Sequence, residues 1–202
     1  MIKIKDMKNR KWINRLCVCL AMGWMAGMQV SAQDVVVKTN ALYWATATPN
    51  LGFEFRLDDR WTLDISGGYN FWTFNEAKNR KWKHFKVMPE ARYWFDKPFT
   101  GHFVGLHSGY TQYNLSAVPL PYDFAETKKH RYEGWATGAG LTYGYLWSLH
   151  PRWLLEASIG LGYAYARFDK YECPHCGDHL GKDSKHYVGP TRAAVSLIYV
   201  IK

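Results

Sequence analysis

The sequence predicts an all-β fold, an eight-stranded antiparallel transmembrane β-barrel that follows a cleaved signal peptide. Three observations favour this fold. The first 32 residues have the features of an export signal, the remainder divides into about eight extended stretches of alternating polarity, and the connections between the stretches alternate between short and long. Strands cross a membrane only in closed rings, because an open edge would leave backbone groups unpaired in lipid.

Residues 1–32 are predicted to be a signal peptide. A basic segment over 3–15 precedes an apolar run over 16–30, and Ser31 and Ala32 supply small residues at its end. The apolar run of about 15 residues is shorter than the ~20 that a membrane-spanning helix needs. We therefore expect export, cleavage before Gln33, and one outer-membrane β-barrel domain over residues 33–202.

The net charge of +9 overstates the basicity of the exported protein. Six of the 26 basic residues and one of the 17 acidic residues lie in the first 32 positions, which leaves 20 basic and 16 acidic residues, or +4. No basic cluster is interleaved with stacking aromatic residues, so we expect no nucleic-acid partner. The 10 Trp and 14 Tyr residues suit membrane interfaces, where one end of the ring is apolar and the other is wet.

Alternation of polar and apolar residues predicts the strands. The eight stretches lie at about 35–46, 51–57, 61–72, 84–95, 102–115, 132–147, 153–168 and 187–201. In the third stretch Trp61, Leu63 and Ile65 share one face, and Thr62 and Asp64 share the other. A soluble sandwich would also alternate. Aromatic residues near both ends of the stretches, and polar faces that carry both charge signs, favour the barrel.

The connections follow the plan expected of such a barrel. Short links at 58–60, 96–101 and 148–152 alternate with long links at 73–83, 116–131 and 169–186. Short periplasmic turns and longer outer loops are typical of membrane barrels, so we expect the three long loops at the cell surface.

Five segments, at 38–42, 49–54, 89–94, 101–105 and 189–193, resemble a family of small bacterial outer-membrane proteins catalogued as domain of unknown function 3575. The resemblance runs in order along nearly the whole exported chain. It implies an eight-stranded barrel in a Gram-negative outer membrane and a genomic neighbourhood that often includes fimbrial-subunit genes. It implies no catalytic residues.

Seven charged residues fall on the predicted lumen face of the strands. They are Glu54, Arg56, Asp64, Glu90, Arg92, Glu156 and Arg192. An eight-stranded barrel has room inside for side chains and little else, and buried charges must be paired. We therefore expect a plug of mutually neutralising charges. A proton or ion path, and with it a small pore, is the alternative.

The last predicted loop holds the one motif with specific chemistry. Cys173 and Cys176, separated by Pro174 and His175, resemble one knuckle of a zinc ribbon, and the candidate further ligands are His175, His179 and His186. Paired cysteines outside the cytoplasm usually form a disulfide, so we expect a Cys173–Cys176 disulfide and no cofactor. Zinc in this loop is the alternative.

Basic residues gather in two other predicted loops. They are Lys78, Arg80, Lys81, Lys83, Lys128, Lys129 and Arg131. Such a surface suits the phosphates of lipopolysaccharide or an acidic surface protein, although a solvated charged loop is an equal explanation.

The predicted function is a non-enzymatic outer-membrane barrel that presents its loops in a structural or adhesive role. Outer-membrane lipid, lipopolysaccharide and surface proteins are the expected partners, and a link to fimbrial assembly follows from the resemblance alone. The alternative is a rim-active lipid A-modifying enzyme. Ser184 and His186 have a suitable spacing, but they lie in a predicted loop without a third orienting group, and His107 and Ser108 point to opposite faces.

Overall fold

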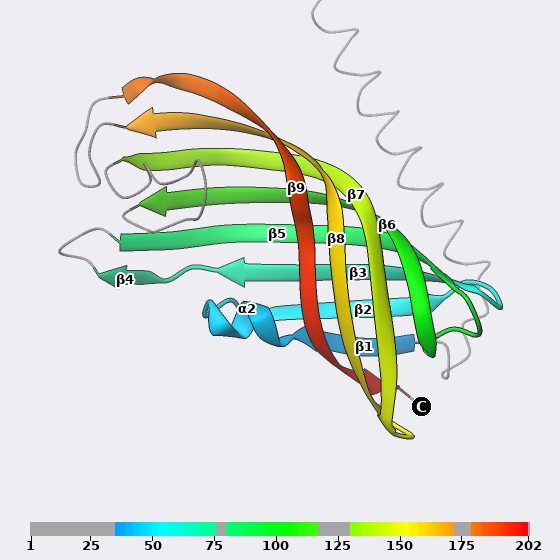
Figure 1. Ribbon diagram of the computed structural model, residues 1–202. Coiled ribbons are helices and arrows are strands. Elements are labelled where there is room, and N and C mark those ends of the chain that lie inside the picture. Colours follow the sequence, from blue (N-terminus) through cyan, green and yellow to red (C-terminus); the bar gives the residue numbers. More distant parts are fainter. Residues whose placement is uncertain (1–34, 76–79, 117–129, 172–178, 202) are drawn as a thin grey trace, which may run out of the picture. The chain divides into compact units, whose positions relative to one another are not determined.

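Alternating side chains give each strand of this chain one polar face and one apolar face. The computed structural model describes residues 35–75, 80–116, 130–171 and 179–201. The strands, labelled in Figure 1, are β1 (Val35–Asn40), β2 (Asn50–Arg56), β3 (Trp61–Asn70), β4 (Thr73–Asn75), β5 (Arg80–Trp94), β6 (Gly101–Ser116), β7 (Arg131–His150), β8 (Trp153–Tyr171) and β9 (His179–Val200). One short helix, α2 (Ala41–Ala45), follows β1.

Eight of the strands close into a ring. The order of neighbours is β3-β2-β1-β9-β8-β7-β6-β5, and the pairing of β5 with β3 completes the circle. Every neighbouring pair is antiparallel. The three-residue strand β4 continues the line of β3 along β5. The prediction of an all-β fold with eight antiparallel strands is confirmed.

The predicted faces of the strands are also confirmed. On β3, Thr62 and Asp64 are fully buried, whereas Trp61 and Ile65 are exposed. The register places Asp64 between Glu54 of β2 and Glu90 of β5, so that polar side chains meet on the inner face. A register shift of one residue would have exchanged the two faces.

The predicted stretch at 35–46 is wrong in its second half. β1 ends at Asn40, whose side-chain oxygen accepts a hydrogen bond from the Leu42 N–H at 3.0 Å and begins helix α2. Asparagine favours this position because its short side chain satisfies an N–H that the helix leaves free. Strand β1 is therefore shorter than the strands on the opposite side of the ring.

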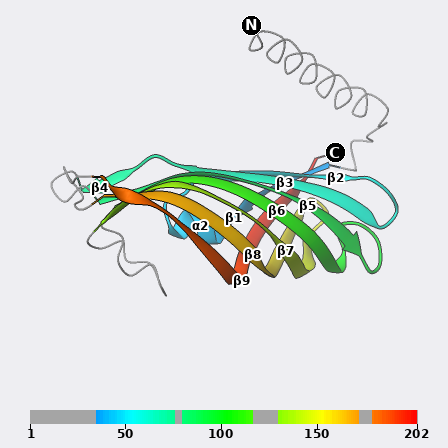
Figure 2. The ribbon, with the colours of Figure 1, turned by 90° about the horizontal axis from the view of Figure 1, so that it is seen from above.

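Two of the three predicted long loops are partly strand. The segment 73–83 contains β4 and the start of β5, and the segment 169–186 contains the end of β8 and the start of β9. Most of the predicted loop 116–131 lies outside the described residues. The long strands β7, β8 and β9 bend strongly along their length, as Figures 1 and 2 show from two directions.

The ring has a turn end, where the short connections at 57–60, 95–100 and 151–152 lie, and a loop end, toward which β3, β6 and β8 run. A cluster of buried apolar side chains fills the interior at the turn end. It consists of Val36, Trp94, Phe103, Leu146, Leu154 and Ile198. The indole N–H of Trp94 donates to Thr62 Oγ1 at 2.9 Å, which satisfies the polar atom of the largest side chain in this cluster.

Within the described residues, no helix is long and apolar enough to cross a membrane.

Candidate functional site

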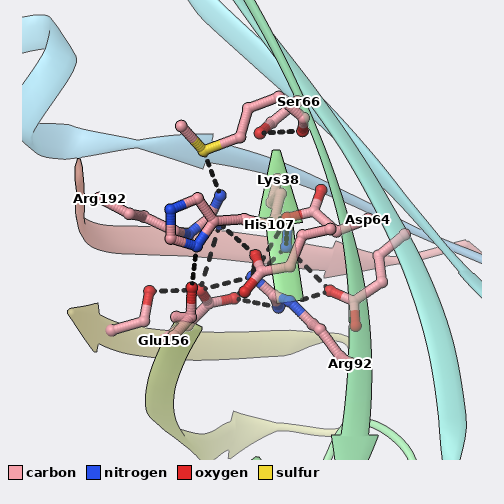
Figure 3. A network of polar contacts seen from close by, with 12 residues as sticks. Lys38, Asp64, Ser66, Arg92, His107, Glu156 and Arg192 are labelled. Carbon is pink, nitrogen blue, oxygen red and sulfur yellow. Dashed lines mark hydrogen bonds and ion pairs between the residues drawn. The ribbon is translucent and has the colours of Figure 1, made fainter. Parts of the chain in front are cut away.

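Arg92 of β5 lies at the centre of a buried ion network in the middle of the ring (Figure 3). Its Nη1 atom donates to Glu54 Oε2 at 2.8 Å and to Glu156 Oε2 at 2.9 Å. Its Nη2 atom donates to Glu156 Oε1 at 3.0 Å and to Asp64 and Glu90 at 3.1 Å. One guanidinium therefore contacts four carboxylates, which come from four different strands.

Two further cations complete the network. Lys38 Nζ lies 2.7 Å from Asp64 Oδ2, 2.8 Å from Glu54 Oε2 and 3.4 Å from Glu156 Oε2. Arg192 Nη2 lies 3.1 Å from both Asp64 Oδ2 and Glu90 Oε2. The second terminal nitrogen of Arg192 donates to the sulfur of Met88 at 3.0 Å.

Hydroxyl groups and an aromatic ring support the charged atoms. Thr62 donates to Glu54 at 2.6 Å and Ser158 donates to Glu156 at 2.9 Å. The guanidinium carbon of Arg92 lies 4.3 Å from the centre of the Phe103 ring, which joins the ion network to the apolar cluster at the turn end. Buried charges are tolerated in proteins when they are paired and hydrogen-bonded in this way.

His107 of β6 lies beside the network, directly across from Glu90. Its Nδ1 and Nε2 atoms each lie 2.8 Å from a hydroxyl oxygen, that of Thr142 and that of Thr191. The imidazole fits because the strands next to it, β7 and β8, carry glycine at this level. A Cβ atom on Gly140 or Gly160 would lie 2.9 or 2.8 Å from His107 Cε1.

The structure brings together six of the seven lumen charges named from the sequence. Arg56 is not among them, because it lies at the turn end with its side chain 39% exposed and pairs with Asp59 at 2.8 Å. Sequence reasoning missed Lys38 and His107. The alternation of the strand could have revealed Lys38. It lies two residues after Val36 and therefore on the same face, and both side chains are buried.

The Cys173, His175 and Cys176 positions lie outside the described residues. The other two candidate zinc ligands lie on β9 and not in a loop. His179 Nε2 pairs with Asp169 Oδ1 at 2.6 Å, and His186 Nδ1 pairs with the hydroxyl of Tyr163 at 2.5 Å. Over the part of the chain that the structure describes, no group of three potential metal ligands gathers.

The predicted basic loops become strand where the structure describes them. Arg80, Lys81 and Lys83 belong to β5, and Arg131 begins β7, where its guanidinium carbon lies 4.1 Å from the centre of the Tyr171 ring. Lys78, Lys128 and Lys129 lie outside the described residues.

Ser184 and His186 were expected in a loop but lie two residues apart on β9. Their hydrogen bonds lead in different directions. The Ser184 N–H donates to its neighbour Asp183 at 2.7 Å, and the His186 ring bonds to Tyr163. A serine nucleophile needs a base within hydrogen-bonding reach of its hydroxyl, and these contacts do not supply one.

A hollow of about 510 Å³ opens near the loop end, a size usual for small-ligand pockets. Its lining residues are Tyr69, Asn70, Lys83, His84, Phe85, Gln112, Tyr113, Asn114, Glu133, Gly134, Trp135 and Asp169. Burial raises the pKa of Tyr113 to about 12 and lowers the pKa of His84. Both side chains are therefore held in their neutral forms at neutral pH.

Comparison with known proteins identifies one relationship. A family model described as "Protein of unknown function (DUF3575)" matches residues 17–201. No curated protein and no solved structure matches the chain.

Proposed function

The chain belongs to the DUF3575 family of proteins of unknown function, and we propose that it is a non-enzymatic β-barrel of the Gram-negative outer membrane with a structural or adhesive role. Its signal peptide would be residues 1–32, and the exported protein would begin at Gln33. Its partners would be outer-membrane lipid, lipopolysaccharide and other surface proteins, fimbrial proteins among them.

The observation that carries this proposal is the inverted distribution of polarity. The fully buried side chains include Glu54, Glu90, Arg92, His107 and Glu156. The middle of the outer face carries aliphatic side chains, with Leu141 69% exposed and Leu106 61% exposed. A water-soluble protein would place these two classes the other way round. Hydrocarbon chains of lipid are the solvent in which this arrangement is stable.

Aromatic residues flank the aliphatic belt at both of its ends. Exposed rings at the turn end include Trp61, Phe95, Trp147 and Trp153. Exposed rings at the loop end include Tyr69, Phe71, Phe85, Tyr110 and Tyr163. Two such girdles mark the two interfaces of a membrane, because amphipathic rings favour the level of the head groups.

The filled interior favours a structural role over a pore. The ion network and the apolar cluster occupy the middle and the turn end of the ring, so side chains fill the space that a channel would need. In this proposal the network stiffens the barrel, and the strands and loops at the loop end meet partners outside the cell.

The experiment is fractionation of cells that express the full chain, followed by analysis of the purified protein. We expect an outer-membrane protein whose first residue is Gln33 and whose gel mobility changes on boiling, because closed barrels resist unfolding in detergent. A matched sample of boiled protein supplies the unfolded mobility. A monodisperse protein that is stable in buffer without detergent would overturn the proposal.

A further inference from the structure

The half of β9 near the loop end has a strand on one side only. β8 pairs with β9 over its whole length, from Tyr199 to His179, whereas β1 pairs with it only from Val200 to Ser196. The Asn40 side chain then bonds to Ala193 O at 3.1 Å and to Val195 N at 3.2 Å, which ends the ladder. Beyond this point no described strand pairs with the second edge of β9, which is the uppermost strand in Figure 1.

Four residues direct their backbone groups toward this open edge. In an antiparallel strand the N–H and C=O of every second residue point the same way. The Ala193 and Val195 groups face Asn40, and the register shift opposite Gly160 and Leu161 adds one residue to β9. A second shift, opposite Lys170 and Tyr171, leaves Leu180 as another extra residue. Between the two shifts, the residues that face the open edge are therefore Lys182, Ser184, His186 and Val188.

The N–H group of Ser184, at the centre of this edge, bonds to a side chain and not to a neighbouring strand. Ser184 N–H donates to the side chain of Asp183 at 2.7 Å, a local substitute for a ladder hydrogen bond. Unpaired strand edges of this length are templates for pairing with another chain. The edge also exposes aliphatic side chains, with Val188 81% and Leu180 52% exposed.

Residues on the two sides of Ser184 differ in ways that suit pairing with a second copy. Residues 180–188 read Leu-Gly-Lys-Asp-Ser-Lys-His-Tyr-Val. If two copies pair antiparallel with Ser184 facing Ser184, Asp183 faces Lys185 and Lys182 faces His186, each twice. Gly181 faces Tyr187, and an aromatic ring across from a strand glycine covers its bare backbone. Opposite charges that face each other across two strands stabilise a sheet.

We propose that the open edge of β9 binds a second copy of this chain through antiparallel pairing centred on Ser184. A two-fold axis through Ser184 makes the contact isologous and closed, so it stops at a dimer. The backbone phase is correct in this register, because Lys182, Ser184 and His186, which direct their N–H and C=O groups toward the partner, then face one another. Registers centred on Asp183 or Lys185 have the same phase, but they place two aspartates or two lysines directly opposite each other at the axis.

The symmetry has a consequence that rests on the proposed membrane location. Strands related by this axis run in opposite directions, so two barrels joined at β9 point their loop ends toward each other. Two such barrels belong to facing membranes. In this arrangement the edge of β9 is an adhesive contact between neighbouring outer membranes.

The test is disulfide trapping in the exported chain purified in detergent, with Cys173→Ser and Cys176→Ser removing the native thiols. Facing residues of a hydrogen-bonded antiparallel pair lie about 5.5 Å apart, a separation that a disulfide spans. Ser184→Cys should shift to twice the monomer mass on mild oxidation. Lys182→Cys is the matched control, because two copies of residue 182 would be offset by four positions, roughly 13 Å along the strands.

Charge reversal tests the register independently of any thiol at the axis. Asp183→Lys should abolish trapping of Ser184→Cys, and the added change Lys185→Asp should restore it. A monomeric Ser184→Cys protein, or equal trapping of Lys182→Cys, would overturn the proposed dimer.

Lipid vesicles that carry the protein should cluster, and vesicles that carry the Asp183→Lys variant should not. Trapping without clustering would retain the dimer and overturn the facing-membrane arrangement, and trapping of a protein that needs no detergent would contradict the membrane location alone.

Discussion

Arg92 of β5 forms a two-pronged ion pair with Glu156 of β8, Nη1 to Oε2 at 2.9 Å and Nη2 to Oε1 at 3.0 Å. These strands are not neighbours, because β6 and β7 lie between them in the ring. The pair therefore ties the two walls together across the interior. Parallel hydrogen bonds between a guanidinium and a carboxylate are among the strongest polar contacts in proteins, and their planar geometry fixes the distance between the walls.

Removing Arg92 should destabilise the barrel severely. Arg92→Met leaves four buried carboxylates with one guanidinium fewer, and loss of one member of a buried pair costs about 3–5 kcal/mol. Denaturant unfolding of the refolded protein in detergent measures the loss. Arg56→Met is the matched control, since Arg56 is partly exposed and should change stability by less than about 0.5 kcal/mol. Equal stabilities of the two variants would contradict the role assigned to the network.

The coupling between the two residues can be measured directly. Glu156→Gln should destabilise the protein less in the Arg92→Met background than in the native one, because contacting residues in one network are not additive. A double-mutant cycle from unfolding free energies gives the difference. Strict additivity would mean that the pair contributes no specific tie between β5 and β8.

An arginine introduced on the outer face and an arginine introduced on the inner face should both destabilise the barrel, but for different reasons. Ile159 is 57% exposed on the outer face, and Ile159→Arg should cost roughly 2–4 kcal/mol if this face meets the middle of a membrane. Gly160 faces inward, where even a Cβ atom would lie 2.8 Å from His107 Cε1, so Gly160→Arg should prevent folding by crowding. Insertion efficiency into lipid vesicles separates these results, and Ile159→Val is the control. Equal tolerance at both positions would contradict the assigned faces.

The stability of the folded protein should fall at alkaline pH because of Tyr113, which lines the hollow near the loop end. Its pKa is raised to about 12 by burial, whereas an unfolded tyrosine titrates near 10, at about its ordinary value. The folded state thus holds this proton more tightly, so stability is unchanged below the unfolded pKa and falls as pH rises from about 10 to 12. Tyr113→Phe should flatten this part of the stability profile. In an ultraviolet titration of the tyrosines, the component that ionises at the highest pH should disappear in the same variant. An unchanged titration would contradict the raised pKa of Tyr113.

The segment between β8 and β9 should carry a disulfide. Cys173 and Cys176 are close in sequence and, in the proposed location, away from cytoplasmic reductants. Mass spectrometry of protein purified without added thiols should show two hydrogens missing from the pair, with little effect on barrel stability because the closed loop is so small. Zinc that survives dialysis and is lost in Cys176→Ser would favour the metal site instead.

The sequence by itself determined the strand class, the number of strands in the ring and which residues face inward. The period of two along β3, β5, β8 and β9 carries this information locally, because neighbouring side chains on a strand must point to opposite faces. The placement of Trp61 and Ile65 on one face and of Asp64 on the other could be predicted without knowing which strands pair with β3. The family was also accessible from local segments, and the match to residues 17–201 confirmed it.

Tertiary structure alone decided which inward charges meet and where the strands end. Arg56 and Arg92 alternate in the same way along their strands, yet only Arg92 reaches the network, because the stagger between strands sets the level of each residue in the ring. The early end of β1 likewise depends on Asn40, which bonds across to β9, 153 residues away from it at Ala193. The open edge of β9 follows from that distant contact. Local patterns choose the face of a side chain, whereas only long-range register chooses its neighbours.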